Sequence, residues 1–260
     1  TAVFSPPDMP RLRLWRVSDP GTIDVLQSAL KDADIFIADG HHRYEAALRY
    51  RGSVRAEREV DHNESINFRI MLLVSFDEPG LITRGYHRLV ESATDEEFAE
   101  IVGSIEKTCD LEDWTPSEGL STAEQIEEFS VALGEREDNE VTFGLYSKEP
   151  GKFHIARMKS PHPAENAIEN SEYSHLHSHI LGPAIAKERE ERVISPHHDA
   201  ALIAGQIESG AARMAFIMRP VPLDEFVSIV TRGWRLPPKA TNFYPKPPAG
   251  AVIQEFGDQL

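Results

Sequence analysis

The chain has 260 residues, a mass of 29.1 kDa, 40% apolar residues, a formal net charge of −16 and an isoelectric point near 5.1. This charge argues against an extended nucleic-acid surface, because affinity for phosphate backbones comes from clustered Lys and Arg. Cys109 is the single cysteine, so no internal disulfide can form, and no apolar run reaches the length of a signal-peptide core or a membrane span. We therefore expect a cytoplasmic protein with one large core or two modest ones.

Two strands and two helices are predicted in the first 60 residues: strands at 12–17 and 35–37, and helices at 19–30 and 44–51. Asp19 followed by Pro20 is typical of a helix start. Gly52 is expected to end the second helix.

From residue 68 onward, the pattern predicts strands at 68–76, 81–90, 141–146, 153–158 and 215–218, and helices at 94–108, 121–133, 174–191, 199–207 and 223–231. The run from Phe68 to Phe76 is the most apolar, which predicts a central strand. Thr94 and Glu97 form a capping-box pattern, and Pro150-Gly151 predicts a hairpin turn. The whole pattern indicates an α+β fold, a mixed β-sheet with flanking helices.

One segment has the character of an anion site. It reads D-I-F-I-A-D-G-H-H-R-Y-E-A-A-L-R-Y and joins a short strand to a helix through Asp39 and Gly40. The first turn of a helix has unpaired N–H groups and the positive end of the dipole, and His41, His42 and Arg43 add side-chain donors there. Because basic residues oppose the dipole at that end, they indicate that an anion such as a phosphate binds. The alternative is an Asp-Gly turn followed by a solvated basic helix end.

The string D-G-H-H-R-x-x-A-A resembles the D-G-x-H-R or G-E-R-R-x-x-A signature of the ParB/sulfiredoxin-like superfamily, whose members bind nucleotide phosphates at a strand-to-helix turn. The longer string I-A-D-G-H-H-R-Y-E-A-A-L resembles the DUF1015 family. Further matches along nearly the whole chain are Leu14-Trp15, Pro79-Gly80-Leu81, His87-Arg88-Leu89-Val90 and the ending from Leu236 to Lys246. The resemblance implies a ParB/sulfiredoxin-like portion at 1–92 and a C-terminal α/β portion at 93–260, which can pack as one unit.

The chain departs from the DUF1015 pattern in two ways. Ala240 stands where the family ending usually has Ser. Members also carry an N-terminal portion of about a hundred residues or more, the size of one further domain. This chain lacks it, so we expect a fragment that works with that missing portion or as a homo-oligomer.

The C-terminal run P-P-K-A-T-N-F-Y-P-K-P-P holds Lys239, Thr241 and Lys246 among five prolines, which exclude a helix or an interior strand. Ammonium and hydroxyl groups suit phosphate oxygens. One helix N-terminus supplies only about half a unit of positive charge, so we expect the tail lysines to complete the site near residue 40. The alternative is a proline-stiffened tail that packs Phe243 and Tyr244 onto the core.

Two other groups of residues could carry chemistry. His87 and Arg88 form a cationic candidate for phosphate binding, or an ordinary surface pair. His175, His177 and His179 would share one face only on a strand. On the predicted helix, His175 and His179 are adjacent, either as a candidate zinc pair without an H-E-x-x-H motif or as surface and capping histidines.

Our first hypothesis is nucleotide-dependent phosphoryl transfer to a small hydroxyl-bearing metabolite, since the resembled superfamily contains kinases of free serine. Mg²⁺ and ATP or ADP are the implied cofactors. Asp39 is the expected metal ligand or base, with His41 and Glu45 as further catalytic candidates. The expected phosphate or nucleotide ligands are Gly40, His42, Arg43, His87, Arg88, Lys239, Thr241 and Lys246.

Two alternatives remain open. The second hypothesis is a nucleotide-binding regulatory module, as in the superfamily's partition proteins, although the acidic charge and the lack of a recognition helix argue against DNA as a partner. The third is sulfiredoxin-like sulfur chemistry, which needs a cysteine inside the motif. His41 occupies the expected place of that cysteine, and Cys109 lies far away in sequence.

Overall fold

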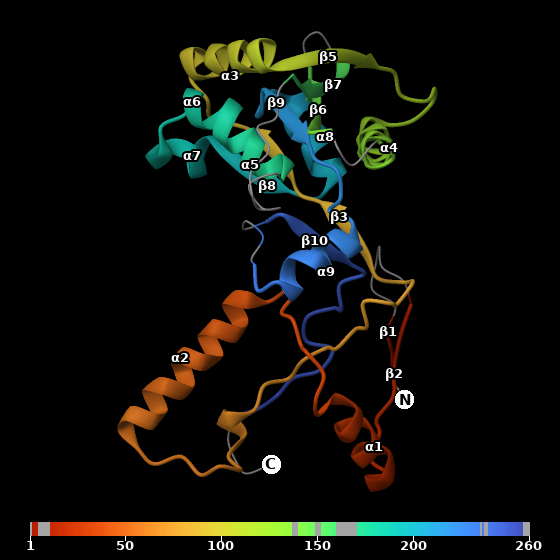
Figure 1. Ribbon diagram of the computed structural model, residues 1–260, viewed down its shortest axis with the longest axis vertical. Helices are drawn as coiled ribbons and strands as arrows, with labels where there is room; N and C mark the ends of the chain where they lie inside the picture. Colours follow the sequence, from red (N-terminus) through yellow and green to blue (C-terminus); the bar gives the residue numbers. More distant parts are fainter. Residues whose placement is uncertain are drawn as a thin grey trace. The chain divides into compact units, whose positions relative to one another are not determined.

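The computed structural model describes residues 2–4, 11–136, 140–148, 152–159, 171–234, 236 and 239–256 (Figure 1). The chain forms two compact units: unit 1 comprises Thr1–Ile82 and Phe243–Leu260, and unit 2 comprises Thr83–Asn242. This division differs from the expected portions at 1–92 and 93–260, because the C-terminal segment joins the N-terminal one. Among the described residues, none of the helices has the length and hydropathy that a membrane crossing requires.

Unit 2 is built on an antiparallel sheet. Within the described residues it has six strands in the order β5-β7-β6-β9-β4-β8, and each neighbouring pair is antiparallel. The strands are β4 (His87–Val90), β5 (Cys109–Trp114), β6 (Thr142–Ser147), β7 (Lys152–Met158), β8 (Ile194–His197) and β9 (Met214–Ile217). The predicted α+β class is confirmed, but the sheet is antiparallel where a mixed one was expected.

Helices cover both faces of this sheet. The helices of unit 2 are α3 (Asp95–Thr108), α4 (Thr122–Gly134), α5 (Glu172–Leu176), the π-helical turn η2 (His177–Leu181), α6 (Gly182–Ala184), α7 (Lys187–Val193), α8 (Ala200–Ser209) and α9 (Leu223–Thr231). Because side chains alternate along a strand, Val90 and Phe216 pack in one cluster with α3, α5 and η2, whereas Leu89 and Ile217 pack in another with α4 and α8.

Local sequence signals located several of these elements. The capping boxes of α3 (Thr94 with Glu97) and α4 (Ser121 with Glu124) are both formed, and β6 and β7 pair as the predicted hairpin. The turn residues Pro150 and Gly151 lie outside the described residues.

Other predictions for unit 2 were met only in part. The helix predicted at 174–191 is divided among α5, η2, α6 and α7, because Pro183 has no N–H for the ladder and Ala186 is extended. The strand predicted at 81–90 is two strands. β5 and β8 were not predicted, since β5 carries exposed polar side chains and β8 contains Pro196.

Unit 1 contains β1 (Ala2–Phe4), β2 (Leu12–Leu14), α1 (Pro20–Leu30), α2 (His41–Glu57) and the 3₁₀ turn η1 (Ser65–Asn67). β1 and β2 pair antiparallel. A further two-stranded sheet joins β3 (Ile82–Gly85) to β10 (Thr241–Tyr244), and the boundary between the units passes through both strands. The C-terminal tail was expected to be coil, but its residues Thr241–Tyr244 form β10. An edge strand tolerates the prolines that flank it.

Three predictions for unit 1 were also wrong. Gly52 does not end α2, because one interior glycine costs only about 1 kcal/mol and the residues after it favour helix. Residues 35–37 and 68–76 are coil rather than strands, since an apolar run becomes a strand only when a neighbouring strand pairs with it.

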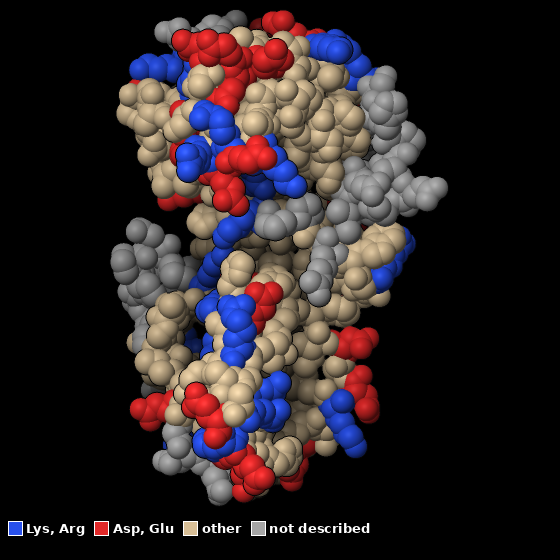
Figure 2. All heavy atoms as spheres, turned by 90° about the vertical axis from the view of Figure 1, so that its left-hand side faces the viewer, with Lys and Arg blue, Asp and Glu red and all other residues tan. Residues whose placement is uncertain are grey.

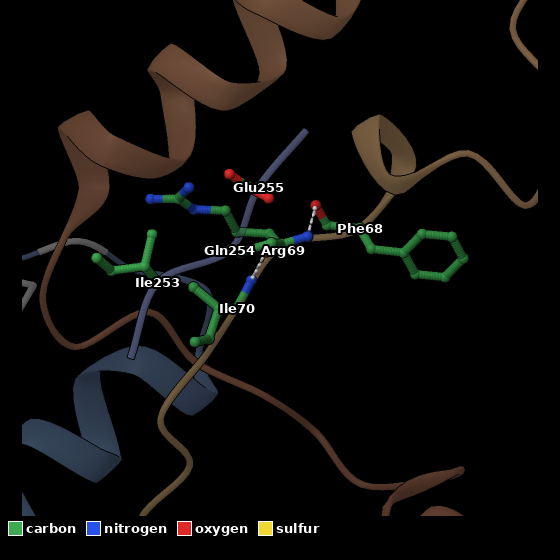
Figure 3. A pocket seen from close by; sticks show the side chains of 6 residues that line it. All are labelled: Phe68, Arg69, Ile70, Ile253, Gln254 and Glu255. Carbon is green, nitrogen blue, oxygen red and sulfur yellow. Dashed lines mark hydrogen bonds between the residues drawn. The ribbon is translucent and has the colours of Figure 1, made fainter. Parts of the chain in front are cut away.

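The side chain of Gln254 connects the C-terminal segment to the first residues of the coil at 68–76 through hydrogen bonds (Figure 3). Its Nε2 donates to the carbonyl oxygens of Phe68 at 3.1 Å and Ser65 at 3.5 Å, and its Oε1 accepts from the Ile70 amide at 2.6 Å. A shallow pocket of about 460 Å³ lies between 68–70 and 253–255.

A substitution at Gly144 in β6 tests how closely the side chains of α4 pack on the sheet. A Cβ atom at this position would lie 2.3 Å from Cε1 of the fully buried Phe129. We expect Gly144→Ala to lower the free energy of unfolding by about 1–3 kcal/mol through overpacking, measured by urea denaturation. Gly103→Ala in α3 is the control, because nothing lies within 4 Å of its Cβ position and alanine should stabilise that helix by about 0.4–1 kcal/mol. Equal stability of the two variants would contradict the packing described.

Candidate functional site

The start of α2 presents backbone donors that no side chain caps. Gly40 is the N-cap residue, its φ of 83° lies in the left-handed region that favours glycine, and it makes no side-chain cap hydrogen bond. Its own amide donates to Asp39 Oδ1 at 2.7 Å. The amides that follow Gly40 in this first turn therefore have no capping oxygen, and they lie at the positive end of a 17-residue helix.

Two cationic side chains lie at the same turn. A Cβ atom at Gly40 would lie 3.1 Å from Nη2 of Arg43, so the guanidinium group folds back over the glycine. The ammonium group of Lys246 lies 3.4 Å from Asp39 Oδ2. Residues separated by more than 200 positions thus meet within unit 1, and the turn gathers Asp39, Arg43 and Lys246 around free amides.

The charge of Asp39 is fixed by these neighbours. Partial burial acts to raise its pKa, but Lys246, the Gly40 amide and Arg43 outweigh that effect, so the pKa lies below its ordinary value. The carboxyl group is consequently ionised at neutral pH and carries the negative charge of this turn.

The other candidates on α2 face solvent. His41 is exposed. The side chain of His42 is 99% exposed, and its Nδ1 lies 3.9 Å from Glu45 Oε2. Glu45 also lies 3.9 Å from Arg49. The sequence placed all of these residues near one anion, and the structure gathers only part of them around the Asp39-Gly40 turn.

A second group of candidates lies in unit 2. Arg88 is only 5% exposed, and its guanidinium donates to the carbonyl oxygens of Tyr86 and Lys239, both at 3.2 Å. It also lies 4.4 Å from the ring centroid of Tyr173. Lys239 is exposed, has a φ of 58°, and its Nζ is 5.4 Å from the Tyr86 ring centroid. Thr241 begins β10 and is half-buried.

Sequence reasoning did not find Tyr86 and Tyr173 as partners of Arg88. No spacing or motif links residue 173 to residue 86. The only signal was the tyrosine beside the His87-Arg88 pair in sequence.

His87 is a buried, neutral residue. Its Nδ1 accepts a hydrogen bond from the Met218 amide at 3.1 Å. Burial, followed by the charges of Arg88 and His198, lowers its pKa to about 4. At neutral pH the side chain therefore carries no charge to offer an anion.

The histidines of the H-x-H-x-H run take different partners. His175 and His179 stack with ring centroids 5.5 Å apart, and His177 Nδ1 lies 2.5 Å from Glu190 Oε1. Within the part of the chain that the structure describes, no group of three or more His, Cys, Asp or Glu residues could hold a metal ion. The described geometry thus gives no support to a zinc site.

These features define an α+β protein with an uncapped, cation-flanked helix start of the kind that binds anions. A family model described as "Protein of unknown function (DUF1015)" matches residues 3–179. The chain belongs to the DUF1015 family, as its motifs suggested.

Solved structures with a similar course of the chain include a conserved hypothetical protein from Pyrococcus furiosus, with 14% identity, a TM-score of 0.39, and coverage of 93% of this chain and 87% of that one. Another is a free serine kinase variant in complex with ADP, with 13% identity, a TM-score of 0.41, and coverage of 94% and 85%. The free serine kinase in complex with AMP has 14% identity, a TM-score of 0.39 and the same coverage. Likeness at this level does not transfer an activity. No curated protein matches the chain.

The burial of His87 predicts a dependence of stability on pH. Its pKa is about 4 in the folded chain and about 6.5 when unfolded, so the unfolded state binds the proton first. The stability is fully present above pH 6.5 and is lost as pH falls towards 4, by up to about 3 kcal/mol. His87→Asn keeps an acceptor without titrating, so its stability should fall less over this range in urea denaturation. Exposed His62→Asn is the control, and a slope unchanged in His87→Asn would contradict the assignment.

Proposed function

We propose that this chain is a nucleotide-dependent phosphotransferase that acts on a small hydroxyl-bearing metabolite, with the phosphates of the nucleotide held at the Asp39-Arg43 turn. The observation that carries the proposal is the meeting of Lys246 and Arg43 at the uncapped start of α2. The serine-kinase-like chemistry is what the superfamily resemblance implies. The DUF1015 family itself is described only as of unknown function.

The turn suits a phosphate chain in donor type and in charge. Backbone amides bind phosphate oxygens without a net charge of their own, and the helix end adds about half a positive charge. Arg43 offers a planar fork of donors and Lys246 a compact ammonium group. Together they supply more positive charge than either a helix start or a single basic side chain.

Charged side chains of both signs lie beside one another across the face drawn in Figure 2. A bound nucleotide would therefore be held by the few donors at the turn rather than by a broad basic surface. This agrees with the overall charge of −16 and favours a small ligand over a nucleic acid.

Asp39 fits a magnesium ion of the kind that proteins hold through one carboxylate, with the nucleotide phosphates as the other ligands. When bound, Mg²⁺ neutralises charge on the transferring phosphoryl group. In the described structure both oxygens of Asp39 are engaged, Oδ1 by the Gly40 amide and Oδ2 by Lys246.

The reaction forms a bond between the acceptor oxygen and the γ-phosphorus and breaks the bond from that phosphorus to the leaving oxygen of the nucleoside diphosphate. The acceptor hydroxyl loses its proton to a base. Asp39 is ionised and is the first candidate, while His41 is the first residue of α2 and Glu45 lies about one turn into that helix. Since such transition states are loose, the main contribution of Arg43 and Lys246 is positioning and charge stabilisation.

The engagement of both Asp39 oxygens also favours a second candidate function, a module that binds nucleotide to regulate a partner without metabolite chemistry. The two functions differ in turnover and agree in nucleotide binding at the turn.

Lys239 and Thr241 were expected as further ligands of the nucleotide phosphates, and a variant of Lys239 tests this expectation. Binding that is unchanged in Lys239→Ala would confine the site to unit 1.

Removing a cation from the turn should weaken nucleotide binding. We expect Arg43→Ala and Lys246→Ala each to reduce the affinity for ATP or ADP by about 1.5–3 kcal/mol, the range for hydrogen bonds to charged groups, with the fold intact. A thermal-shift titration measures this, because nucleotide at a hundredfold its Kd stabilises by about 2.7 kcal/mol. Arg49→Ala is the matched control, since this arginine lies further along α2 and only approaches Glu45 at 3.9 Å. A loss of equal size in all three variants would exclude the turn as the site.

Asp39→Asn separates the two candidate functions. The amide keeps the size of the side chain and removes its charge, so nucleotide should still bind while phosphoryl transfer to a panel of hydroxyl-bearing metabolites falls by about a hundredfold or more. The measurement is release of nucleoside diphosphate with Mg²⁺. A native chain that binds nucleotide but shows no turnover with any acceptor would favour the regulatory module.

A further inference from the structure

The two units differ sharply in how they bury apolar side chains. Among the described residues, 25 large apolar side chains are exposed, and 22 of them belong to unit 1. The other three are Leu111, Val131 and Leu202 of unit 2. Monomeric proteins rarely expose large contiguous apolar patches, so a run of exposed apolar residues in unit 1 is a candidate surface for a partner.

The longest run of such residues is the coil that was predicted to be a strand. The side chains of Ile70, Met71, Leu72, Leu73 and Val74 are all exposed, Leu72 to 67%. Within the described residues, the peptide groups of 71–74 make no hydrogen bond. This segment therefore presents unbonded peptide groups together with exposed apolar side chains, which is the combination that allows a chain to pair with another strand.

Gln254 shows which edge is available. Its side chain bonds the carbonyl oxygen of Phe68 and the amide of Ile70, two groups that point to the same side of an extended chain (Figure 3). In a strand that continues from these two groups, even-numbered residues would direct their peptide groups towards the C-terminal segment, and Arg69, Met71 and Leu73 would direct theirs to the opposite edge.

The charges that flank the run select the partner and its direction. Arg69 precedes it, and Asp77 and Glu78 follow it in the turn closed by the Ser75 carbonyl. A parallel copy of the segment would set arginine against arginine and acid against acid. An antiparallel copy brings each arginine towards the acidic end of the other chain, which makes the segment complementary to itself.

We propose that two copies of this chain pair through residues 69–75 as antiparallel strands, with Leu72 on the two-fold axis. Met71 then forms a hydrogen-bonded pair with Leu73, and Arg69 with Ser75, both on the open edge. Arg69 then lies at the end of the pair where the partner chain enters the turn that carries Asp77, which favours a contact between the two opposite charges. Ile70 lies opposite Val74. The side chains of Ile70, Leu72 and Val74 share one face in both copies, and those of Met71 and Leu73 share the other. This register pairs the unbonded peptide groups of the two copies, matches their apolar side chains and brings opposite charges together.

The experiment compares cysteine variants of the full chain. In the proposed register the two Leu72 Cα atoms form a non-hydrogen-bonded pair about 4.5 Å apart, which a disulfide can span. Leu72→Cys should form a covalent dimer under a mild oxidant. Val74→Cys, exposed on the same face, should not, because the two copies of residue 74 are about 13 Å apart along the strands. The native Cys109 is buried and does not compete.

Sedimentation velocity over a concentration series supplies the reversible measurement. The native chain should form a dimer, and Leu72→Lys should raise the dimer dissociation constant by about a hundredfold, because it sets two ammonium groups against each other on the axis. Leu202→Lys, an exposed leucine of unit 2, should leave the dimer unchanged. Arg69→Asp should weaken the dimer, and the double variant Arg69→Asp with Asp77→Arg should restore it.

A native chain that stays monomeric at every concentration would overturn the proposal and leave this edge to a different partner. Crosslinking of Val74→Cys as readily as Leu72→Cys would overturn the register. Circular dichroism of each variant verifies that the helices are intact, which the exposure of the substituted side chains leads us to expect.

Discussion

The sheet of unit 2 has to bury both of its faces, and most of the fold follows from that constraint. Side chains that alternate along β4, β6 and β9 enter two separate clusters, so helices are needed on either side. Gly144 shows how closely they approach, because Phe129 occupies the space of a side chain there. The same constraint places Arg88 and His87 inside unit 2, where they bond backbone groups instead of facing solvent.

Unit 1 follows a different logic. Among its polar contacts are those of the Gln254 side chain and the pair between Lys246 and Asp39, while many of its large apolar side chains are exposed. Both contacts tie the C-terminal segment to the first 82 residues.

Sequence reasoning succeeded where the signal was local. Thr94 with Glu97, and Asp19 followed by Pro20, begin helices because their side chains or ring satisfy the first turn wherever the helix lies. It failed where the outcome depended on distant partners. Residues 68–76 are the most apolar run and yet form no strand, whereas the polar β5 is one because β7 pairs with it.

The candidate site shows the same division. The turn at Asp39 and Gly40 was visible in the sequence, since glycine and a helix start have local signatures. Charge balance led us to expect lysines from the tail, but it could not tell Lys246, which meets Asp39, from Lys239, whose carbonyl is bonded by Arg88 in the other unit. The burial and neutrality of His87 could not be read from its neighbours in sequence.

The ion pair of Asp39 and Lys246 means that the turn already contains an anion of its own. The carboxylate takes the ammonium group and one backbone amide, so an incoming phosphate must compete with it for the same donors. The loss of these Asp39 contacts therefore offsets part of the binding free energy of a phosphate, so anions that bind weakly do not displace the carboxylate. The displaced carboxylate becomes free to take another partner only while the ligand is bound. In the proposed function, the phosphate and the Asp39 carboxylate thus exclude each other from the same donors, and release of Asp39 accompanies ligand binding.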